Sequence, residues 1–495
     1  MFPGGFSLIW LSLVALFSGT LLPIAFSPFN IYSVAFILPA ILLIIWLHSS
    51  AKRAFWIGWL FGLGFFGTGT SWIYISIHQY GNASVPLAAV ITFAFCAFLA
   101  LFFGLFGYVF RKFFARYSDA KQCLLVFPAL WLVFEYLRST VLTGFPWILL
   151  GYSQLTTPLR GFSPIFGVYG LSLLTAIISG ALVLLATKQH RIPKIIAMLL
   201  IFGLIGSGWL FENHAWTKPT ATPIKVSLIQ GNIPQTVKWD PSYVLANINV
   251  YKHLTLDHLS SHLIVWPEGA FPIYAQDAAP FISQLSKLAA HNHGNIIFGV
   301  PIRDDKTQLY YNGLLLIGDN QGQYLKRHLV PFGEYTPLTS LFGKAMQYFN
   351  IPMSSFTPGP RHQPDLKVQN IRIAPFICYE IVYPVQVLNA SSHSELLLTV
   401  SDDSWFGHSI ALMQHLQMAQ MRSLEVGRFQ LLSTNTGVTA FISPLGKIIQ
   451  GSSIDQRVVL TDDVQPMTGK TPLMRWHYYP VIGMVLLMLL AALFL

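Results

Sequence analysis

The sequence predicts two structural parts: an α-helical membrane bundle of about eight transmembrane helices, and an α/β domain outside the membrane. The first observation is composition, since 53% of the 495 residues are hydrophobic and only 10% are charged, against about a quarter charged in soluble domains. The second is a series of apolar segments, each near the ~20 residues that cross a bilayer. The third is a later stretch in which short β-rich runs alternate with helical periodicity.

The apolar segments predict eight spans. Seven precede residue 212 and one closes the chain; they cover residues 8–25, 31–47, 54–77, 85–110, 124–142, 165–186, 195–211 and 478–495. The first segment follows no basic region and has no convincing small-residue cleavage site, so we expect a retained helix and not a cleaved signal peptide.

The loops between these segments predict the orientation. Loops after the second, fourth and sixth segments carry nine Lys/Arg residues, whereas those after the first, third and fifth carry only Arg160. Basic loops stay on the cytoplasmic side, so both termini are predicted to be cytoplasmic and the α/β domain periplasmic in a bacterial inner membrane. The net charge of +10 comes mostly from these loops, which argues against a nucleic-acid partner.

The predicted domains are a seven-helix bundle (1–215), an α/β domain (216–470) and a C-terminal transmembrane helix (476–495). Nine short runs in the second domain have strand character: 224–230, 263–266, 296–300, 314–317, 371–377, 396–400, 429–433, 438–442 and 458–461. Helical periodicity covers 241–259, 281–290 and 411–426.

Three predicted strand ends carry groups suited to nucleophilic catalysis. Cys378 follows an apolar run directly, Glu268 follows another, and Lys326 lies after a third β-rich run. A thiol needs a base, and the oxyanion formed on attack needs a fixed donor or cation. Taken singly, each residue has an ordinary explanation: a buried structural cysteine, a turn carboxylate and a surface cation. The combination favours a Glu-Lys-Cys site.

The motifs WPEG (266–269), YLKRHLVPFGEY (324–335) and ICYE (377–380) in this order resemble the nitrilase superfamily of carbon-nitrogen hydrolases. With the apolar N-terminal half, the whole chain resembles the apolipoprotein N-acyltransferase family. The resemblance implies a nitrilase-like αββα sandwich and a catalytic triad of Glu268, Lys326 and Cys378. It implies acyl transfer, through a Cys thioester, from a phospholipid donor to the α-amine of a diacylglyceryl-apolipoprotein, with ping-pong kinetics.

Supporting residues are assigned around this triad. Glu334 is expected to support the lysine, Asn312 to orient the charged groups, Tyr379 to donate its backbone N–H to the oxyanion, and Glu380 to position the thiol loop or the acceptor amine. Trp239 is expected to shape the substrate entrance. Asp402 departs from the family segment, where asparagine is usual, so no role is assigned to it.

Two further groups of residues are expected to contact lipid. Trp147 lies in a loop that resembles one at the outer face of the membrane in the family; an ordinary interfacial aromatic is the alternative. Leu338, Phe342 and Met346 share one face of an amphipathic stretch after Glu334, which predicts a membrane-dipping lid. Packing of that face on the domain is the alternative.

Glu135 and Arg138 are spaced i,i+3 within the fifth predicted span and are expected to point into the bundle and to pair. We find no metal-ligand pattern, expect no cofactor, and predict a monomer.

Two rival functions remain open: a membrane-tethered amidase of the nitrilase type that hydrolyses a small amide, and a transporter with a sensory domain. The transporter is disfavoured because few ionisable residues lie in the spans and no inverted repeat is evident.

Overall fold

The computed structural model describes residues 8–187, 191–335 and 355–494, and its chain divides into two compact units. The first unit comprises Met1–Tyr74, Ser84–His214 and Arg475–Leu495, and the second comprises Ile75–Ala83 and Ala215–Met474. The sequence did not predict that the short segment Ile75–Ala83 groups with the second unit.

Most predicted spans of the first unit are helices of membrane-crossing length. Within the described residues, five segments are long and apolar enough: Leu8–Ala25, Val85–Phe114, Asp119–Arg138, Pro158–Ala186 and Arg191–Phe211. A sixth is broken, because α3 (Ala51–Gly69) and the following Ile73–Tyr80 are bent by 61°. The other two, α2 (Val34–Leu47) and α17 (Tyr479–Phe494), are shorter apolar helices. Five or six of the described helical segments are therefore candidate spans by length and composition, and the total of eight stays a prediction.

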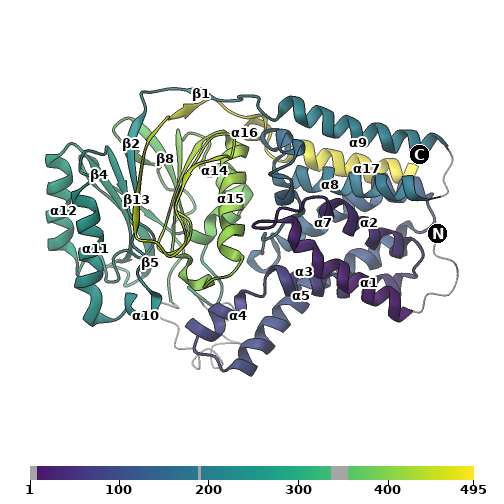
Figure 1. Ribbon diagram of the computed structural model, residues 1–495, viewed down its shortest axis with the longest axis horizontal. Coiled ribbons are helices and arrows are strands. Elements are labelled where there is room, and N and C mark those ends of the chain that lie inside the picture. The colour runs from purple at the N-terminus through teal and green to yellow at the C-terminus, as the bar shows by residue number, and fades with distance from the viewer. Residues whose placement is uncertain (1–7, 188–190, 336–354, 495) are drawn as a thin grey trace. The chain divides into compact units, whose positions relative to one another are not determined.

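Helix α8 (Ser163–Ala186) is the buried centre of this unit, whereas α9 (Arg191–Phe211) has large apolar side chains on its surface. Figure 1 shows α8 running beside α9 and α17. On α9, Phe202 is 73% exposed and Leu199 68%. A soluble protein would bury such a surface, so these side chains are suited to contact with lipid.

The two buried charges of α7 (Phe127–Arg138) both bind the loop that follows the helix. Glu135 Oε1 accepts the Leu150 N–H at 2.7 Å, and Arg138 Nη1 donates to the Trp147 carbonyl at 2.9 Å. They point inward, as predicted. Ionised groups are costly in an apolar interior unless they are hydrogen-bonded, and here they also satisfy the backbone of an irregular loop.

The second unit contains two six-stranded sheets. The first has the order β13-β2-β3-β4-β5-β6 and the second β12-β11-β10-β9-β8-β7. The first sheet consists of β2 (Ile224–Gln230), β3 (Leu263–Val265), β4 (Asn295–Arg303), β5 (Tyr310–Gly318), β6 (Gly322–Leu325) and β13 (Val458–Val464). The second consists of β7 (Leu366–Val368), β8 (Ile371–Ile377), β9 (Leu396–Ser401), β10 (Phe429–Thr434), β11 (Ala440–Ile442) and β12 (Ile448–Gly451). The central strands β2-β3-β4 and β8-β9-β10 are parallel, and the outer pairings are antiparallel.

Helices cover the outer faces of both sheets, which gives the predicted αββα sandwich. Figure 1 shows α11 (Val244–Leu256) and α12 (Ala279–His291) beside one sheet, and α14 (Pro384–Ala390) and α15 (Ala411–Val426) beside the other. Alternate strand residues form the core between the sheets, including Val226 and Leu228 from β2 and Ile371 and Ile373 from β8. The alternation follows from the period of two along a strand.

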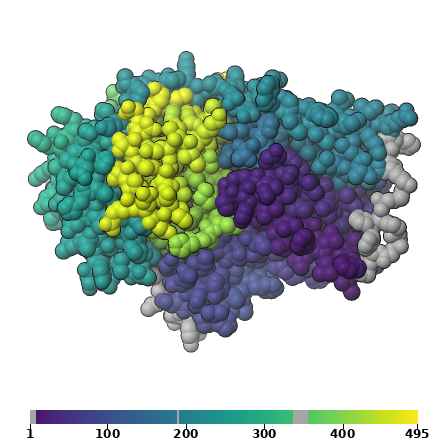
Figure 2. Space-filling view, in the orientation of Figure 1, coloured from purple at the N-terminus to yellow at the C-terminus, as the bar shows by residue number. Residues whose placement is uncertain are grey.

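Strand β8 leads to the candidate nucleophile, and its neighbours explain the proline within it. β7 pairs only with Ile371–Ile373, whereas β9 pairs along β8 as far as Ile377. Pro375 therefore lies where one side of β8 has no partner strand, as expected for a residue without a backbone donor. At the edge of this sheet opposite β7, β12 is exposed at every position, and Figure 2 shows residues coloured yellow at the surface.

The close packing of α3 against α5 (Val85–Phe114) generates a stability prediction. A Cβ on Gly62 would lie 2.8 Å from the Ala100 Cα, whereas a Cβ on Gly67 of the same helix would meet nothing within 4 Å. We expect Gly62→Val to lower the free energy of unfolding by about 1–3 kcal/mol, and Gly67→Val to leave it nearly unchanged. Thermal unfolding of both variants in the same detergent tests this; equal melting temperatures would contradict it.

Candidate active site

Cys378 directly follows β8 and begins a short 3₁₀ turn, Cys378–Val382. Its φ is 51°, in the left-handed region that non-glycine residues rarely adopt. Such a conformation costs about 1–3 kcal/mol, and it turns the side chain away from the path of the strand. The residue is 9% exposed and packs against the core between the sheets, so the site is largely enclosed.

The other two members of the predicted triad meet beyond the ends of two strands of one sheet, β3 and β6. Lys326 follows β6, and its Nζ lies 3.4 Å from Glu268 Oε1 and 2.9 Å from Glu334 Oε1. Asn312 on β5 donates to the same two oxygens, at 2.8 Å each. The structure thus brings Glu268, Lys326, Glu334 and Asn312 into one hydrogen-bonded cluster.

Electrostatics connects this cluster with Cys378. Burial raises the pKa of the Cys378 thiol well above its usual value; the charge of Glu268 adds to this, and Lys326 opposes it. Burial alone would lower the pKa of Lys326, but Glu268 and Glu334 outweigh burial and raise it. The resting site therefore holds a protonated thiol and an ammonium group, so nucleophilic attack requires a base.

Glu380 holds the lysine loop and the cysteine turn together. Its side chain is fully buried and accepts the Arg327 N–H at 2.8 Å and the Ile377 N–H at 2.9 Å. The Tyr324 hydroxyl donates to both carboxylate oxygens, at 3.0 and 2.9 Å. Of the two roles considered for Glu380, this geometry favours positioning of the thiol loop.

The aromatic side chains around the turn form a small cluster. His328 stacks on Tyr383 with ring centroids 3.6 Å apart, and Tyr379 meets Tyr383 edge-on at 5.2 Å. Tyr379 therefore packs its ring beside the site, while its backbone N–H belongs to the cysteine turn. The ring of Trp239 lies close to Gly269, which directly follows Glu268, so Trp239 also borders the cluster.

Trp147 differs from the expectation that it faces lipid. Its side chain is fully buried in the first unit, 4.9 Å from the Trp72 ring and stacked on Phe145 at 6.1 Å. The carbonyl hydrogen bond to Arg138 turns this loop inward, which explains the burial. Leu338, Phe342 and Met346, the predicted lid residues, lie outside the described residues.

Sequence reasoning missed several buried polar residues beside the site. His415 on α15 lies 3.2 Å from the Asp403 carboxylate, and its Nε2 lies 3.3 Å from the Cys378 carbonyl. Lys238 and Asp402 form a second buried pair at 2.6 Å. Only the acidic run at residues 402–403 was a signal, since neither Lys238 nor His415 belongs to a motif identified in the sequence.

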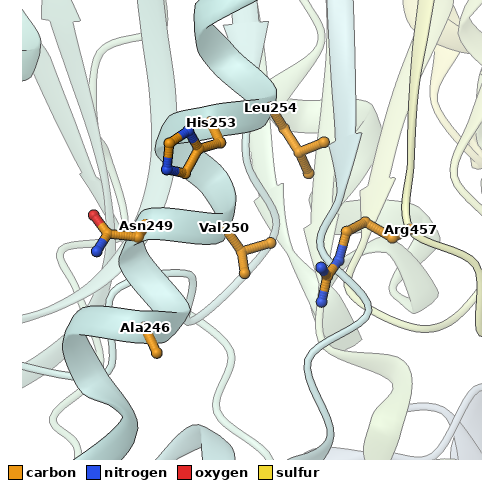
Figure 3. Close-up of a pocket in the computed structure, with 6 residues that line it drawn as sticks. All are labelled: Ala246, Asn249, Val250, His253, Leu254 and Arg457. Carbon is orange, nitrogen blue, oxygen red and sulfur yellow. The ribbon is translucent and has the colours of Figure 1, made fainter.

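A surface pocket of about 310 Å³ lies along α11 (Figure 3) and contains none of the predicted catalytic residues. It is lined by Ala246, Asn249, Val250, His253, Leu254 and Arg457. In Figure 3, Val250 and Leu254 point toward Arg457. The pocket offers no nucleophile, so the chemistry is assigned to the cluster around Cys378.

Comparisons with known proteins agree with both halves of the chain. Residues 18–181 match the family model described as the apolipoprotein N-acyltransferase N-terminal domain, and residues 225–472 match that of carbon-nitrogen hydrolase. An apolipoprotein N-acyltransferase of Coxiella burnetii is 49% identical, covering 97% of this chain and 99% of that protein. One from Azotobacter vinelandii is 43% identical, covering 97% and 94%. The solved structure of Saccharomyces cerevisiae Nit3, a nitrilase superfamily member, aligns with 53% of this chain and 97% of its own, at 16% identity and a TM-score of 0.39.

The role of Glu380 can be tested by Glu380→Gln. The amide nitrogen would face backbone N–H donors that now point at a carboxylate, so buried donors lose their acceptor. We expect about 1–3 kcal/mol less stability and slower alkylation of Cys378. Thermal unfolding and peptide mapping after iodoacetamide treatment measure both, with the exposed Asp305→Asn as control. Unchanged melting and labelling would contradict the assignment.

A pH dependence follows from His328, because burial and the neighbouring Lys326 lower its pKa to about 4. The unfolded chain binds this proton below about pH 6.5, whereas the folded protein does not until about pH 4. The free energy of unfolding is therefore not reduced by His328 above pH 6.5. It falls by about 2–3 kcal/mol as the pH is lowered from 6.5 toward 4, because only the unfolded chain gains the proton in that range. His328→Phe, which keeps a ring against Tyr383, should flatten the melting temperature between pH 6.5 and 4. If the melting temperatures of wild type and His328→Phe change with pH in parallel, His328 is not the cause of the pH dependence.

Proposed function

Since this chain belongs to the apolipoprotein N-acyltransferase family, we propose that it transfers a fatty acyl chain from a phospholipid to the N-terminal amine of a diacylglyceryl-apolipoprotein. The observation that carries the proposal is the cluster of Glu268, Lys326 and Cys378 at three strand ends, with Glu268 and Lys326 acting electrostatically on the thiol. Family identity supports the substrates, and the cluster supports the chemistry.

In the first half-reaction, Glu268 takes the proton of Cys378 and the thiolate attacks the ester carbonyl of the phospholipid. Lys326 and the Tyr379 N–H stabilise the oxyanion, as fixed donors do in acyl transfer. When the tetrahedral intermediate collapses, the C–O bond breaks and Glu268 returns its proton to the leaving oxygen. A lysophospholipid departs, and the acyl group stays on Cys378 as a thioester.

In the second half-reaction, the apolipoprotein amine attacks the thioester. Glu268 removes a proton from the amine, an amide bond forms, and the C–S bond breaks. The released thiolate recovers the proton through Glu268, so the site returns to its starting state. Glu334 holds Lys326 throughout at 2.9 Å, and Asn312 holds both carboxylates. One donor product leaves before the acceptor binds, which requires ping-pong kinetics.

The first unit supplies the surroundings that lipid substrates need. We assign it as the membrane bundle, with residues 1–215 and 476–495 forming eight spans, both termini in the cytoplasm and residues 216–470 in the periplasm. The excess of basic residues in alternate loops supports this orientation. An apolar pocket of about 510 Å³ between α3 and α5, lined by Leu63, Phe93 and Cys96 among others, is of a size suited to an acyl chain.

The proposal is tested by intact-mass analysis after incubation with a phospholipid of defined acyl chain. We expect one added acyl group, removed by hydroxylamine, because a thioester is the intermediate. Cys378→Ala should abolish the adduct, and Lys326→Met should slow its formation about 10²–10³-fold through loss of an oxyanion partner.

The matched control is Cys123→Ala, which removes a thiol from the first unit at a position outside the apolar pocket and should keep the adduct. An acyl group on another residue, or none on folded wild-type protein, would overturn the proposal. Turnover of a small amide without any acyl adduct would instead favour an amidase of the carbon-nitrogen hydrolase type.

A further inference from the structure

Lys238 and Asp402 are two buried charges that the proposed mechanism does not use. Lys238 ends the short helix α10 (Gln235–Lys238), and its side chain is 1% exposed. Its Nζ lies 2.6 Å from Asp402 Oδ2, and Asp402 is itself buried directly after β9. Burying two charges is costly unless their geometry and remaining hydrogen bonds are well satisfied.

Both members of the pair also bind Glu268. Lys238 Nζ donates to the Glu268 carbonyl at 3.0 Å, and the Asp402 backbone N–H donates to Glu268 Oε2 at 3.0 Å. Asn312 and Lys326 bind the other oxygen, Oε1. The carboxylate is therefore fixed at both oxygens, and its backbone is fixed as well.

The surroundings hold this pair in place. The Ser404 hydroxyl donates to Asp402 Oδ1 at 2.6 Å, and Asn435 Nδ2 donates to it at 3.2 Å. Gly269, directly after Glu268, has φ 61°, and a Cβ there would lie 3.2 Å from Lys238 Nζ. A glycine at this position lets the ammonium group approach the Glu268 carbonyl closely.

We propose that Lys238 and Asp402 are a positioning pair that fixes Glu268 for its proton transfers with Cys378 and the acceptor amine. This inference rests on the proposed role of Glu268 as the base. The carboxylate of Asp402 supplies the negative charge that balances the Lys238 ammonium group in a buried site.

The experiment is a double-mutant cycle on the rate of Cys378 acylation by phospholipid. Lys238→Met alone should slow acylation about 100-fold, the loss typical of a small misplacement of a catalytic group. In the Glu268→Gln background, Lys238→Met should cause no further loss, because its effect passes through Glu268. Asp402→Asn keeps the backbone N–H and one acceptor oxygen, so a smaller loss of about tenfold is expected.

A structural role gives a different result. Equal losses in the wild-type and Glu268→Gln backgrounds, or no loss in either, would overturn the inference. The control is Lys225→Met, which removes a surface lysine bonded to Ser260 and should leave the rate unchanged. If the Lys238→Met variant does not fold, the double variant Lys238→Met/Asp402→Leu takes its place in the same cycle, because it removes both buried charges together.

The same cycle can be read by iodoacetamide alkylation of Cys378, which requires no phospholipid. If wild-type protein is alkylated but never acylated, the proposed acyl transfer is contradicted, while the alkylation cycle still tests the positioning role of Lys238 and Asp402. If Lys238→Met and Glu268→Gln have additive effects on the alkylation rate, only the positioning role is contradicted.

Discussion

Burial of the Lys326 ammonium group between two carboxylates is the interaction on which the site depends. A cation that is 1% exposed must be paired and hydrogen-bonded, and Glu268 and Glu334 meet that requirement from separate segments of the chain. Since the lysine follows β6, Glu268 follows β3 and Asn312 lies on β5, the order of strands in one sheet fixes their spacing. The ion cluster therefore stabilises the fold and prepares the chemistry at the same time.

The cysteine belongs to the other sheet, so the two sheets must be held in register at this point. Glu380 does this: one carboxylate accepts hydrogen bonds from the lysine loop and from the end of β8. The strained φ of Cys378 is retained because the surrounding hydrogen bonds over-determine it. His415 adds a further constraint from α15 through the Cys378 carbonyl. The nucleophile is thus positioned by contacts to its backbone.

Much of this arrangement could be predicted from the sequence, for identifiable reasons. The end of β8 at Ile377 and the whole of α15 were predicted to the residue, because long apolar runs and strong periodicity mark them. Strands β7 and β12 were missed because runs of three or four residues carry no resolvable period. The 61° break after Gly69 was missed because hydropathy continues across it. The pairing of Lys238 with Asp402 was missed because residues 164 positions apart leave no local pattern.

The two carboxylates beside Lys326 are not equivalent, and their contacts argue for different roles. Glu334 lies nearer the ammonium group, at 2.9 Å against 3.4 Å, and its second oxygen accepts the Val330 N–H of its own loop. Glu268 is the carboxylate whose charge acts on the Cys378 thiol. Glu334 is therefore suited to balancing the charge of the lysine. The longer contact of Glu268 with the ammonium group, together with its action on the thiol, fits the role of base that the proposed mechanism gives to Glu268.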